Sequence, residues 1–570
     1  MVDGIIKDDK TSIANGLNNH FANIATKMSE NIPYTTEYKK YLGESITESI
    51  FLHPVNKIEV ERTISQMNGN KAMGHDKIHA RNLKDLKEII SPLICHIVNL
   101  AFKTGEYPQQ LKLAKVIPIY KKSDPTNPNN YRPISLLSSI NKITEKIIYS
   151  RLIDYLNRQN FFYSYQFGFR KNHSTEMALI EIIDNIRQSI DDNNFTLGLY
   201  IDLTKAFDLV NHQILLNKLY HYGIRGVAND LFKCYLTNRT QYVQVGETVS
   251  TTKTMTCGVP QGSVLGPLLF LIYVNDVYKS IKADIRLFAD DTNIFIKERD
   301  PNLLKERAET EFNKLNKWFF DNKIVVNTEK TQYTVFARKN KPIPEILNSL
   351  KLNNMEVKKS KNITYLGMRL DDQLKWNSHI QHLQTSLVKT IKSFQIIKNW
   401  LPKNEKIQLY YAYVHSKIKY GIQIYGCASK SLMNKIQVLQ NKSIKILFGL
   451  DFLTPTKQIL HDSKLLSVKD LHLITVAQFV HRQQLKLLPP IFDTYFMRNN
   501  QTIDRQTRQS TLLRVDRTRT AQAKNKIAIK GSNIWNILTH ELNTDMTKLS
   551  PAGFVKMVKG HLIAKYNTQA

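Results

Sequence analysis

The chain contains 570 residues, 42% of them hydrophobic, and carries a formal net charge of +31. This length exceeds what one hydrophobic core supports and predicts several domains. The longest apolar run, Pro267 to Val274, is far shorter than the roughly 20 residues of a membrane-spanning helix. No signal-peptide core follows Met1, so we expect an intracellular protein of the nucleus and cytoplasm, with no membrane partner. The four cysteines are scattered without a Cys-x-x-Cys pair, which argues against a disulfide framework and a structural zinc.

The first segment, residues 1–45, is predicted to form a polar helical lead-in. One of its faces is apolar, with side chains at helical spacing: Ile13, Leu17, Phe21 and Ile24. Residues 46–195 are predicted to combine helices with a basic hairpin between Lys121 and Arg132. The segment from Ser123 to Asn130 is rich in Pro, Asn, Asp and Ser, which predicts the turn of this hairpin.

Two predicted strands each end in a carboxylate. In the first, aliphatic residues at 197, 199 and 201 alternate with a second row that ends at Asp202. In the second, the strand before Asp290 and Asp291 is followed by an apolar segment at 294–296, which predicts a hairpin with the Asp pair in its turn. If the strands are neighbours, the carboxylates converge, and such a cluster needs cations, for which Mg²⁺ is the preferred partner. Two divalent ions about 3.5–4 Å apart are the usual device for in-line phosphoryl transfer, so the pattern indicates nucleotidyl transfer.

Each element alone has a simpler interpretation. An Asp-Asp pair is a common signal for a hairpin turn, and Asp202 could cap a helix that begins at Lys205. The loop Gly-Val-Pro-Gln-Gly at residues 258–262 lies between the two strands. Its presence together with both carboxylate strands favours the catalytic interpretation.

Positive charge is concentrated after Trp376. That part contains 29 Lys and Arg against 9 Asp and Glu, an excess of 20. Such an excess predicts contact with a polyanion; a solvated helical face is the alternative, but it usually mixes both signs. Residues 376–450 show apolar side chains at helical spacing, and residues 451–570 are predicted to be a basic, α-rich domain.

Eight motifs, in this order, resemble the reverse transcriptase of a non-LTR retrotransposon, closest to those of jockey-like LINE elements. They are KAMGHDKI at 71–78, VIPIYKK at 116–122, NYRPISLL at 130–137, LYIDLTKAFD at 199–208, GVPQGSVLGP at 258–267, FADD at 288–291, NTEKT at 327–331 and YLG at 365–367. The resemblance runs from about residue 10 to about 450 and more weakly to the end. The chain departs from the family pattern at Met73, His75, Lys77 and Phe288, and none of these changes removes a catalytic group.

The resemblance implies an α+β fold of the right-hand polymerase class. Fingers would span residues 46–195, an antiparallel-sheet palm 196–375 and a basic helical thumb 376–450. The lead-in at 1–45 and the α-rich domain at 451–570 would flank them.

The resemblance also implies the roles of the carboxylates. Asp202, Asp290 and Asp291 would hold two Mg²⁺ ions, or Mn²⁺ in their place, with the backbone carbonyl of Leu203 as a further ligand. Lys330 would protonate the leaving pyrophosphate, although a lysine at the start of a strand is commonly only solvated.

Five residues are implied in dNTP binding. Lys121 and Arg132 would clamp the triphosphate, since Arg offers a planar fork and Lys a point charge. Phe207 would exclude a 2′-hydroxyl, while Gln261 and Gly262 would let the backbone approach the nucleotide or the template. The alternatives are surface charge for the lysines, core packing for Phe207 and an ordinary turn for the glycine loop.

Two further sets of residues are implied in holding nucleic acid. Tyr365, Leu366 and Gly367 resemble the primer grip, a tight hairpin that supports the primer end. Basic residues after the thumb suggest RNA or target-DNA contact, with a solvated helix as an equal alternative: Arg505, Arg508, Arg514, Arg517 and Arg519.

The expected function is RNA-directed DNA synthesis at a target nick, with an RNA template, a DNA primer and dNTPs as partners. The alternatives are a catalytically inactive nucleic-acid-binding remnant, or a reverse transcriptase of the group II intron or telomerase type. RNA-dependent RNA synthesis is disfavoured by Phe207, because such enzymes need a polar residue there. The endonuclease that such elements commonly encode is not evident. We therefore expect a fragment, a degenerate copy, or an enzyme that uses a nick made elsewhere.

Overall fold

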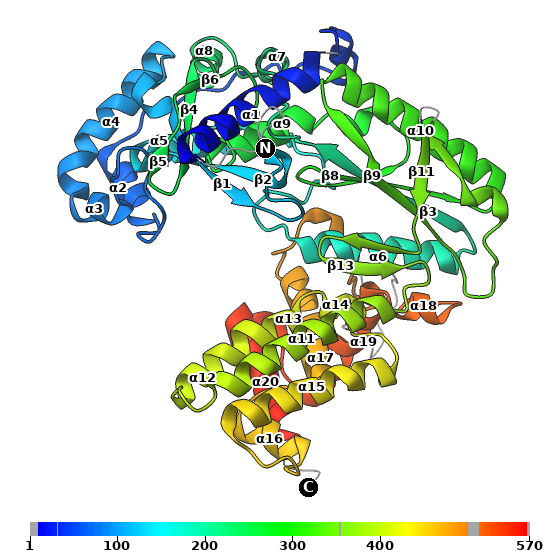
Figure 1. Cartoon of the computed structure of the whole chain (residues 1–570). Helices are drawn as coiled ribbons and strands as arrows, with labels where there is room; N and C mark the ends of the chain where they lie inside the picture. Colours follow the sequence, from blue (N-terminus) through cyan, green and yellow to red (C-terminus); the bar gives the residue numbers. More distant parts are fainter. Residues whose placement is uncertain (1–8, 31, 353–354, 500–511, 567–570) are drawn as a thin grey trace.

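The computed structural model describes residues 9–30, 32–352, 355–499 and 512–566. The predicted mixture of α and β structure is confirmed. In Figure 1 the strands and the helices that cover them occupy the upper part of the molecule, and a body made of helices lies below them. No helix in the described ranges is both long and apolar enough to cross a membrane.

The larger sheet has six strands in the order β10-β11-β9-β3-β8-β7. Neighbouring strands run antiparallel except for β9 and β11, which are parallel. The prediction of a wholly antiparallel sheet is therefore wrong at this one pairing. The strands are β3 (Phe195–Thr204), β7 (Asp284–Phe288), β8 (Asp291–Glu298), β9 (Val325–Phe336), β10 (Leu350–Leu352) and β11 (Met355–Lys359).

This sheet is apolar on both faces. Leu197, Leu199 and Ile201 of β3 belong to the core on one face, which α10 (Pro301–Asp321) covers. Tyr200 points to the core on the other face, against α6 (Thr175–Asp191). Figure 1 shows α10 above the sheet and α6 below it. The predicted alternation is thus confirmed, and residues 195–201 are buried on both faces.

A second sheet has the order β2-β1-β4-β5, with β6 also paired to β4. The predicted lead-in forms α1 (Lys10–Glu30), whose Leu17 and Phe21 pack on Val116 and Val243 of this sheet. Its strands are β1 (Leu113–Tyr120), β2 (Tyr131–Leu136), β4 (Arg239–Val245), β5 (Thr248–Val249) and β6 (Lys253–Met255). The helices near it are α2 (Lys57–Ser65), α3 (Ala80–Asp85), α4 (Lys87–Thr104), α5 (Ser139–Arg158), α7 (His212–His221), α8 (Val227–Leu236) and α9 (Leu265–Val274).

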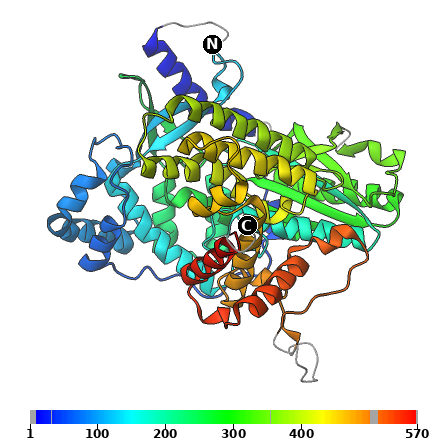
Figure 2. The same ribbon diagram turned by 90° about the horizontal axis from the view of Figure 1, so that it is seen from below.

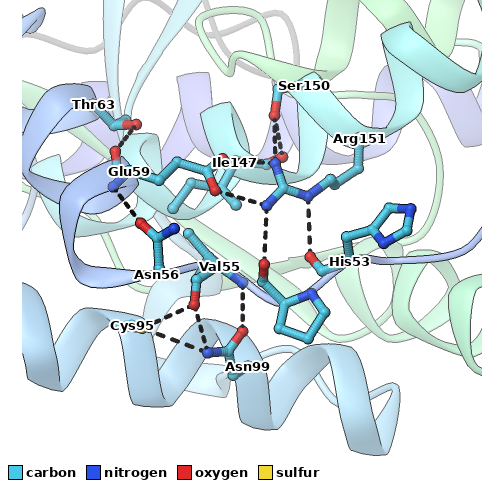
Figure 3. A network of polar contacts seen from close by, with 11 residues as sticks. His53, Val55, Asn56, Glu59, Thr63, Cys95, Asn99, Ile147, Ser150 and Arg151 are labelled. Atoms are coloured by element: carbon cyan, nitrogen blue, oxygen red, sulfur yellow. Dashed lines mark hydrogen bonds and ion pairs between the residues drawn. The ribbon is translucent and has the colours of Figure 1, made fainter.

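A polar network fastens the chain before α2 to α4 and α5 (Figure 3). The Arg151 guanidinium on α5 donates to both carboxylate oxygens of Glu59, at 2.6 and 2.8 Å, and to the carbonyl of His53. Asn99 on α4 accepts from the Val55 amide at 2.8 Å and donates back to the Val55 carbonyl at 2.9 Å. Because the backbone amide and carbonyl of Val55 both have hydrogen-bond partners, the segment that contains Val55 can pack against helices without pairing with a strand.

The lower body consists of helices, as predicted for residues 376–450 and 451–570. The apolar residues predicted at helical spacing, Leu387, Ile391 and Phe394, are all buried in α11. Figure 2 shows this body from below, in yellow, orange and red. Its helices are α11 (Asn377–Ile397), α12 (Lys403–Tyr410), α13 (Ser416–Lys419), α14 (Ile422–Tyr425), α15 (Lys430–Phe448), α16 (Thr456–Asp462), α17 (Val468–Gln484), α18 (Ala521–Lys524), α19 (Ile527–Leu542) and α20 (Pro551–Ala564).

Helix α6 joins the larger sheet to the lower body. The Asp184 carboxylate accepts from the backbone amides of Ile527 and Ala528, which begin α19. Asp191 likewise accepts from the amides of Arg519 and Thr520 before α18. Carboxylates at helix N-termini satisfy donors that the helix itself leaves free, so α6 positions the start of both helices.

Candidate active site

Two adjacent strands bring the three predicted carboxylates together. Strands β3 and β8 are antiparallel neighbours whose last registered pair is Ile201 with Thr292. One further step along the register places Asp202 beside Asp291. Asp290 lies in the turn between β7 and β8, where Ala289 has a φ of +56°. The predicted hairpin is confirmed, although Asp291 is already the first residue of β8. The two strands that precede the carboxylates, β3 and β7, are not direct neighbours, because β8 lies between them.

The surroundings of the Asp pair disfavour its negative charge. Both side chains reach solvent, yet enough protein surrounds them for desolvation to be the first cause of a raised pKa at each. Desolvation, then Asp290, then Asp202 raise the pKa of Asp291 to about 6. For Asp290, Asp202 raises the pKa further while Arg132 and Lys121 oppose the rise. A cation bound here would relieve the repulsion that these pKa values express.

The donor set suits a hard divalent ion. Asp202, Asp290, Asp291 and the carbonyl of Leu203 offer only oxygen ligands, the type that Mg²⁺ and Mn²⁺ prefer. Within the described ranges no three His, Cys, Asp or Glu side chains already lie close enough to hold one ion. The residue types therefore fit the ion, and their side chains would have to draw closer to bind it.

A bulge in β9 brings Lys330 to the carboxylates. The register places Tyr200 opposite Gln332 and Asp202 opposite Asn327, so four residues of β9 bulge out between these pairs. The Thr331 hydroxyl donates to the Asn327 carbonyl at 2.7 Å and closes the bulge. As a result, Lys330 Nζ lies 3.8 Å from Asp202 Oδ2. Bulges commonly re-aim side chains near functional sites.

The β1–β2 hairpin presents the predicted phosphate-binding pair. Ile119 is registered with Arg132, and the Lys121 amide donates to the Asn130 carbonyl at 2.8 Å beside the turn. Burial is the first cause of a lowered pKa at Lys121, followed by Arg132 and Lys330, while Asp202 opposes the shift. Three cations thus lie within electrostatic range of the carboxylates.

Phe207 follows β3 in a turn, not in a helix. Residues 205–209 form turns, and Lys205 has a φ of +49°, so the alternative of a helix beginning at Lys205 is wrong. The Phe207 ring stacks on Phe270 at a centroid distance of 4.4 Å and meets Phe169 edge-on at 6.0 Å. One side of Phe207 therefore packs on α9, while the side chain as a whole remains partly exposed.

The loop before α9 packs tightly on its neighbours. Gln261 Nε2 donates to Asp208 Oδ1 at 3.0 Å, and the Gln261 carbonyl accepts from the Ser135 amide of β2 at 2.8 Å. Gly262 has a φ of +125°, and a Cβ there would lie 2.4 Å from the Ser135 carbonyl oxygen. Glycine is therefore required at 262 by backbone contact with β2, whether or not a nucleotide approaches it.

The predicted YLG hairpin is present. It joins β12 (Asn362–Tyr365) to β13 (Met368–Asp371), and both turn residues, Leu366 and Gly367, have positive φ, as a type I′ turn requires. The Tyr420 hydroxyl donates to the Leu366 carbonyl. Burial, then the nearby Asp291, raise the pKa of Tyr365 well above its usual range. The hairpin therefore lies beside the carboxylates and is supported by the lower body.

Of the five C-terminal arginines, the structure describes three, and none of these forms a hydrogen bond or ion pair with the carboxylates. Arg505 and Arg508 lie outside the described residues. Arg514 pairs with Asp516 at 2.8 Å, and Arg519 pairs with Asp192 at 3.6 Å, next to the start of β3. Arg517 is exposed.

Two residues near the cluster had no predicted role. Asp208 orients the Gln261 side chain, and its pKa is raised chiefly by burial. Asp208 lies in the same motif as Asp202, six positions after it, and this position in the motif was the available sequence signal. Tyr420 supports the turn at Leu366 from 54 positions further along the chain, and no local pattern predicts such a contact.

Comparison with known proteins gives one family and a consistent set of relatives. Residues 119–370 match the family described as reverse transcriptase (RNA-dependent DNA polymerase). The chain is 28% identical over 453 residues to the RNA-directed DNA polymerase from mobile element jockey of Drosophila melanogaster, covering 76% of this chain and 48% of that protein. It is 29% identical over 443 residues to the probable RNA-directed DNA polymerase from transposon X-element of the same species, with 76% and 48% coverage.

A third relative, the probable RNA-directed DNA polymerase from transposon BS of Drosophila melanogaster, is 29% identical over 432 residues, with 72% and 47% coverage. The chain spans about half the length of these curated relatives. The family match includes all three carboxylates, both basic residues of the β1–β2 hairpin and the YLG turn. Residues 119–370 are therefore similar to a reverse transcriptase domain, and the chain as a whole is similar to the RNA-directed DNA polymerases of jockey and related Drosophila mobile elements.

Proposed function

We propose that this chain is an RNA-directed DNA polymerase of a non-LTR mobile element, which extends a DNA 3′ end on an RNA template. The observation that carries the proposal is the junction of β3 with the β7–β8 hairpin. Three carboxylates lie near one another there, within electrostatic range of the cations Lys121, Arg132 and Lys330. Carboxylates for metal ions and cations for a triphosphate are the two groups that nucleotidyl transfer needs.

The architecture then divides as a right hand. Residues 46–195 would be the fingers, 196–375 the palm and 376–450 the thumb, with 1–45 and 451–570 as flanking domains. The six-stranded sheet would form the palm floor, and the β1–β2 hairpin would close over the nucleotide from the fingers.

The carboxylates would hold two Mg²⁺ ions, or Mn²⁺, through Asp202, Asp290, Asp291 and the Leu203 carbonyl. When bound, such ions supply Lewis acidity to the primer hydroxyl and to the leaving phosphate. Although the chain raises the pKa of Asp291 to about 6, this carboxylate is still mostly charged at pH 7 and available to bind a cation.

The cations would bind the triphosphate and assist the departure of pyrophosphate. Arg132 and Lys121 would hold its oxygens by charge-assisted hydrogen bonds. Lys330 would exchange its long ion pair with Asp202 for a contact to the leaving pyrophosphate and donate the Nζ proton to it. Because Lys330 is 65% exposed, this exchange needs little desolvation.

The remaining residues would set nucleotide choice and position. The Phe207 ring would occupy the space of a 2′-hydroxyl, with its other side packed on Phe270. Asp208 would hold the Gln261 amide toward the template strand. The turn at Leu366 and Gly367 would support the primer end.

The implied partners are an RNA template, a DNA primer or target and dNTPs, encountered in the nucleus and cytoplasm. The relatives named above support this assignment, since their names identify RNA-directed DNA polymerases of mobile elements. Arg514, Arg517 and Arg519, together with Arg505 and Arg508, would add contacts to RNA or target DNA.

Primer extension on an RNA template with Mg²⁺ tests the proposal, comparing dNTPs with rNTPs. We expect extension with dNTPs in the wild type and none in Asp290→Ala. Asp284→Ala is the matched control, because Asp284 is an exposed carboxylate at the other end of β7. If the wild type binds the hybrid in a salt-sensitive way but does not extend it, the chain is a catalytically inactive nucleic-acid-binding remnant.

A further inference from the structure

A basic cavity lies at the end of the larger sheet that is remote from the carboxylates. Its volume is about 510 Å³, within the range of roughly 300–1,000 Å³ typical of ligand sites. The loop after β9 forms one wall and the end of β11 the other. Five of the lining residues are cations and one is an acid: Arg338, Lys339, Lys341, Lys359, Lys361 and Asp372.

The register of the sheet places this cavity away from the polymerase site. Thr196 of β3 is paired with Phe336, the last residue of β9 before the basic loop. Asp202 lies six positions after Thr196, which corresponds to roughly 20 Å along a strand. The cavity is therefore a separate site from the carboxylates.

Two cations of the cavity, Lys341 and Lys359, donate hydrogen bonds to neutral groups. Lys341 Nζ donates to the Asn193 carbonyl at 2.9 Å and lies 3.7 Å above the Phe195 ring. Lys359 Nζ donates to Asn348 Oδ1 at 2.7 Å. Burial, then Arg299, lower the pKa of Lys341, so the local field is already positive before a ligand is bound.

We propose that this cavity, defined by Arg338, Lys339, Lys341, Lys359 and Lys361, binds the phosphodiester backbone of a nucleic-acid segment separate from the template–primer hybrid. Solvated protein surfaces usually mix both signs of charge, whereas here a single carboxylate opposes five cations. Cations spread over two walls match a chain of phosphates better than one isolated anion, because each phosphate can meet its own cation.

The segment around α18 lies beside the cavity. Gln522 on α18 donates to the carbonyl of Gln373, which lines the cavity. Arg519 pairs with Asp192, one residue from the Asn193 carbonyl that holds Lys341. A bound strand could thus pass from the sheet edge to the segment around Arg519 without crossing the carboxylates.

Fluorescence anisotropy on the full chain tests the proposal. One arm uses a labelled, unnicked DNA duplex and the other a labelled single-stranded RNA, both with a saturating unlabelled hybrid whose primer is chain-terminated. The test variant replaces three exposed cations: Arg338→Gln, Lys339→Gln and Lys361→Gln. The matched control removes three exposed charges from α2, α4 and α8: Lys57→Gln, Lys103→Gln and Lys233→Gln.

Each lost phosphate contact lowers the slope of log affinity against log salt by about 0.9 for duplex DNA and about 0.7 for a single strand. With three contacts removed, we expect the magnitude of this slope to decrease by about 2.7 for the duplex or by about 2.1 for the RNA. The affinity of the test variant at low salt should fall at least about tenfold. The arm in which this loss occurs identifies DNA or RNA as the source. Equal slopes for the test and control variants, with matching thermal unfolding, would overturn the proposal.

The measurement does not depend on polymerase activity, so it separates this inference from the proposed function. A loss of slope in the test variant of a chain that fails to extend primers would support the cavity and contradict the polymerase. The Asp290→Ala protein should bind the second probe as the wild type does.

Discussion

Replacing Phe207 by Ala should weaken the discrimination between dNTPs and rNTPs. The Phe207 ring lies directly after the strand that carries Asp202, with one side fixed against Phe270. Without the ring, a 2′-hydroxyl would no longer meet a steric obstacle. We expect the kcat/KM ratio of dNTP over rNTP to fall about 10–200-fold, the range given by adding or removing one small group in an apolar pocket.

The same substitution should also cost stability. Replacing a fully buried Phe by Ala typically lowers the free energy of unfolding by about 3–5 kcal/mol. Phe207 is only partly buried, but it loses a stacked partner and an edge-on partner, Phe270 and Phe169. Each such pair contributes about 0.5–1.5 kcal/mol beyond its buried area. A loss of about 2–3 kcal/mol in the free energy of unfolding follows.

Single-nucleotide extension with each nucleotide, together with urea denaturation, separates the two effects. Phe270→Leu is the matched control, because it removes the stacking partner and leaves the Phe207 ring. We expect this control to lose stability and to keep its nucleotide preference. If Phe207→Ala extends primers with an unchanged dNTP to rNTP ratio, Phe207 is a packing residue and the steric argument is refuted.

Three further predictions concern charge and backbone. The pKa of Asp291 is higher in the folded state than in the unfolded state, so the folded state binds the proton more tightly. With metal ions removed by EDTA, the thermal stability of the protein should therefore fall as the pH rises from about 4 to about 6. Asp291→Asn should remove this pH dependence from the thermal unfolding profile. Glu181→Gln should cost about 3–5 kcal/mol in urea denaturation, because it leaves the Arg286 charge buried without its partner. Gly262→Ala should abolish primer extension and lower the melting temperature, because its Cβ would collide with the Ser135 carbonyl.

Each of these has a control and a result that would contradict it. Glu298→Gln is the control for Glu181→Gln, because it breaks a partly exposed ion pair with Arg307 and should lower the free energy of unfolding by less than about 1 kcal/mol. If Glu181→Gln costs no more than this control, the argument from the burial of the Glu181–Arg286 pair is wrong. Gly246→Ala changes a glycine of positive φ with open space around it, so activity should persist. A wild-type pH profile that Asp291→Asn leaves unaltered would remove Asp291 as the titrating group.

The strands that carry the carboxylates were predictable because two-residue alternation is a local property. The hairpin at Asp290 and Asp291 was predictable because a turn between two apolar segments is also a local property, whereas the turn at Leu366 was expected only from the resemblance to the primer grip. The bulge that brings Lys330 to Asp202 was not predictable, because it depends on how β9 registers against β3. The parallel pairing of β11 with β9 also depends on tertiary packing.

Helix α6 has consequences for how the chain can be divided. Thirteen of its 17 residues are buried, so it has almost no solvent-facing side of its own. Its backbone amides should therefore exchange with deuterium only when the whole molecule opens, and it should belong to the most protected cooperative unit. A shortened protein ending after α15 would expose the side of α6 that carries Asp184 and Asp191, and would leave both without the amides they bind. The smallest part of this chain that folds on its own therefore has to include the segment from Arg519 to α19.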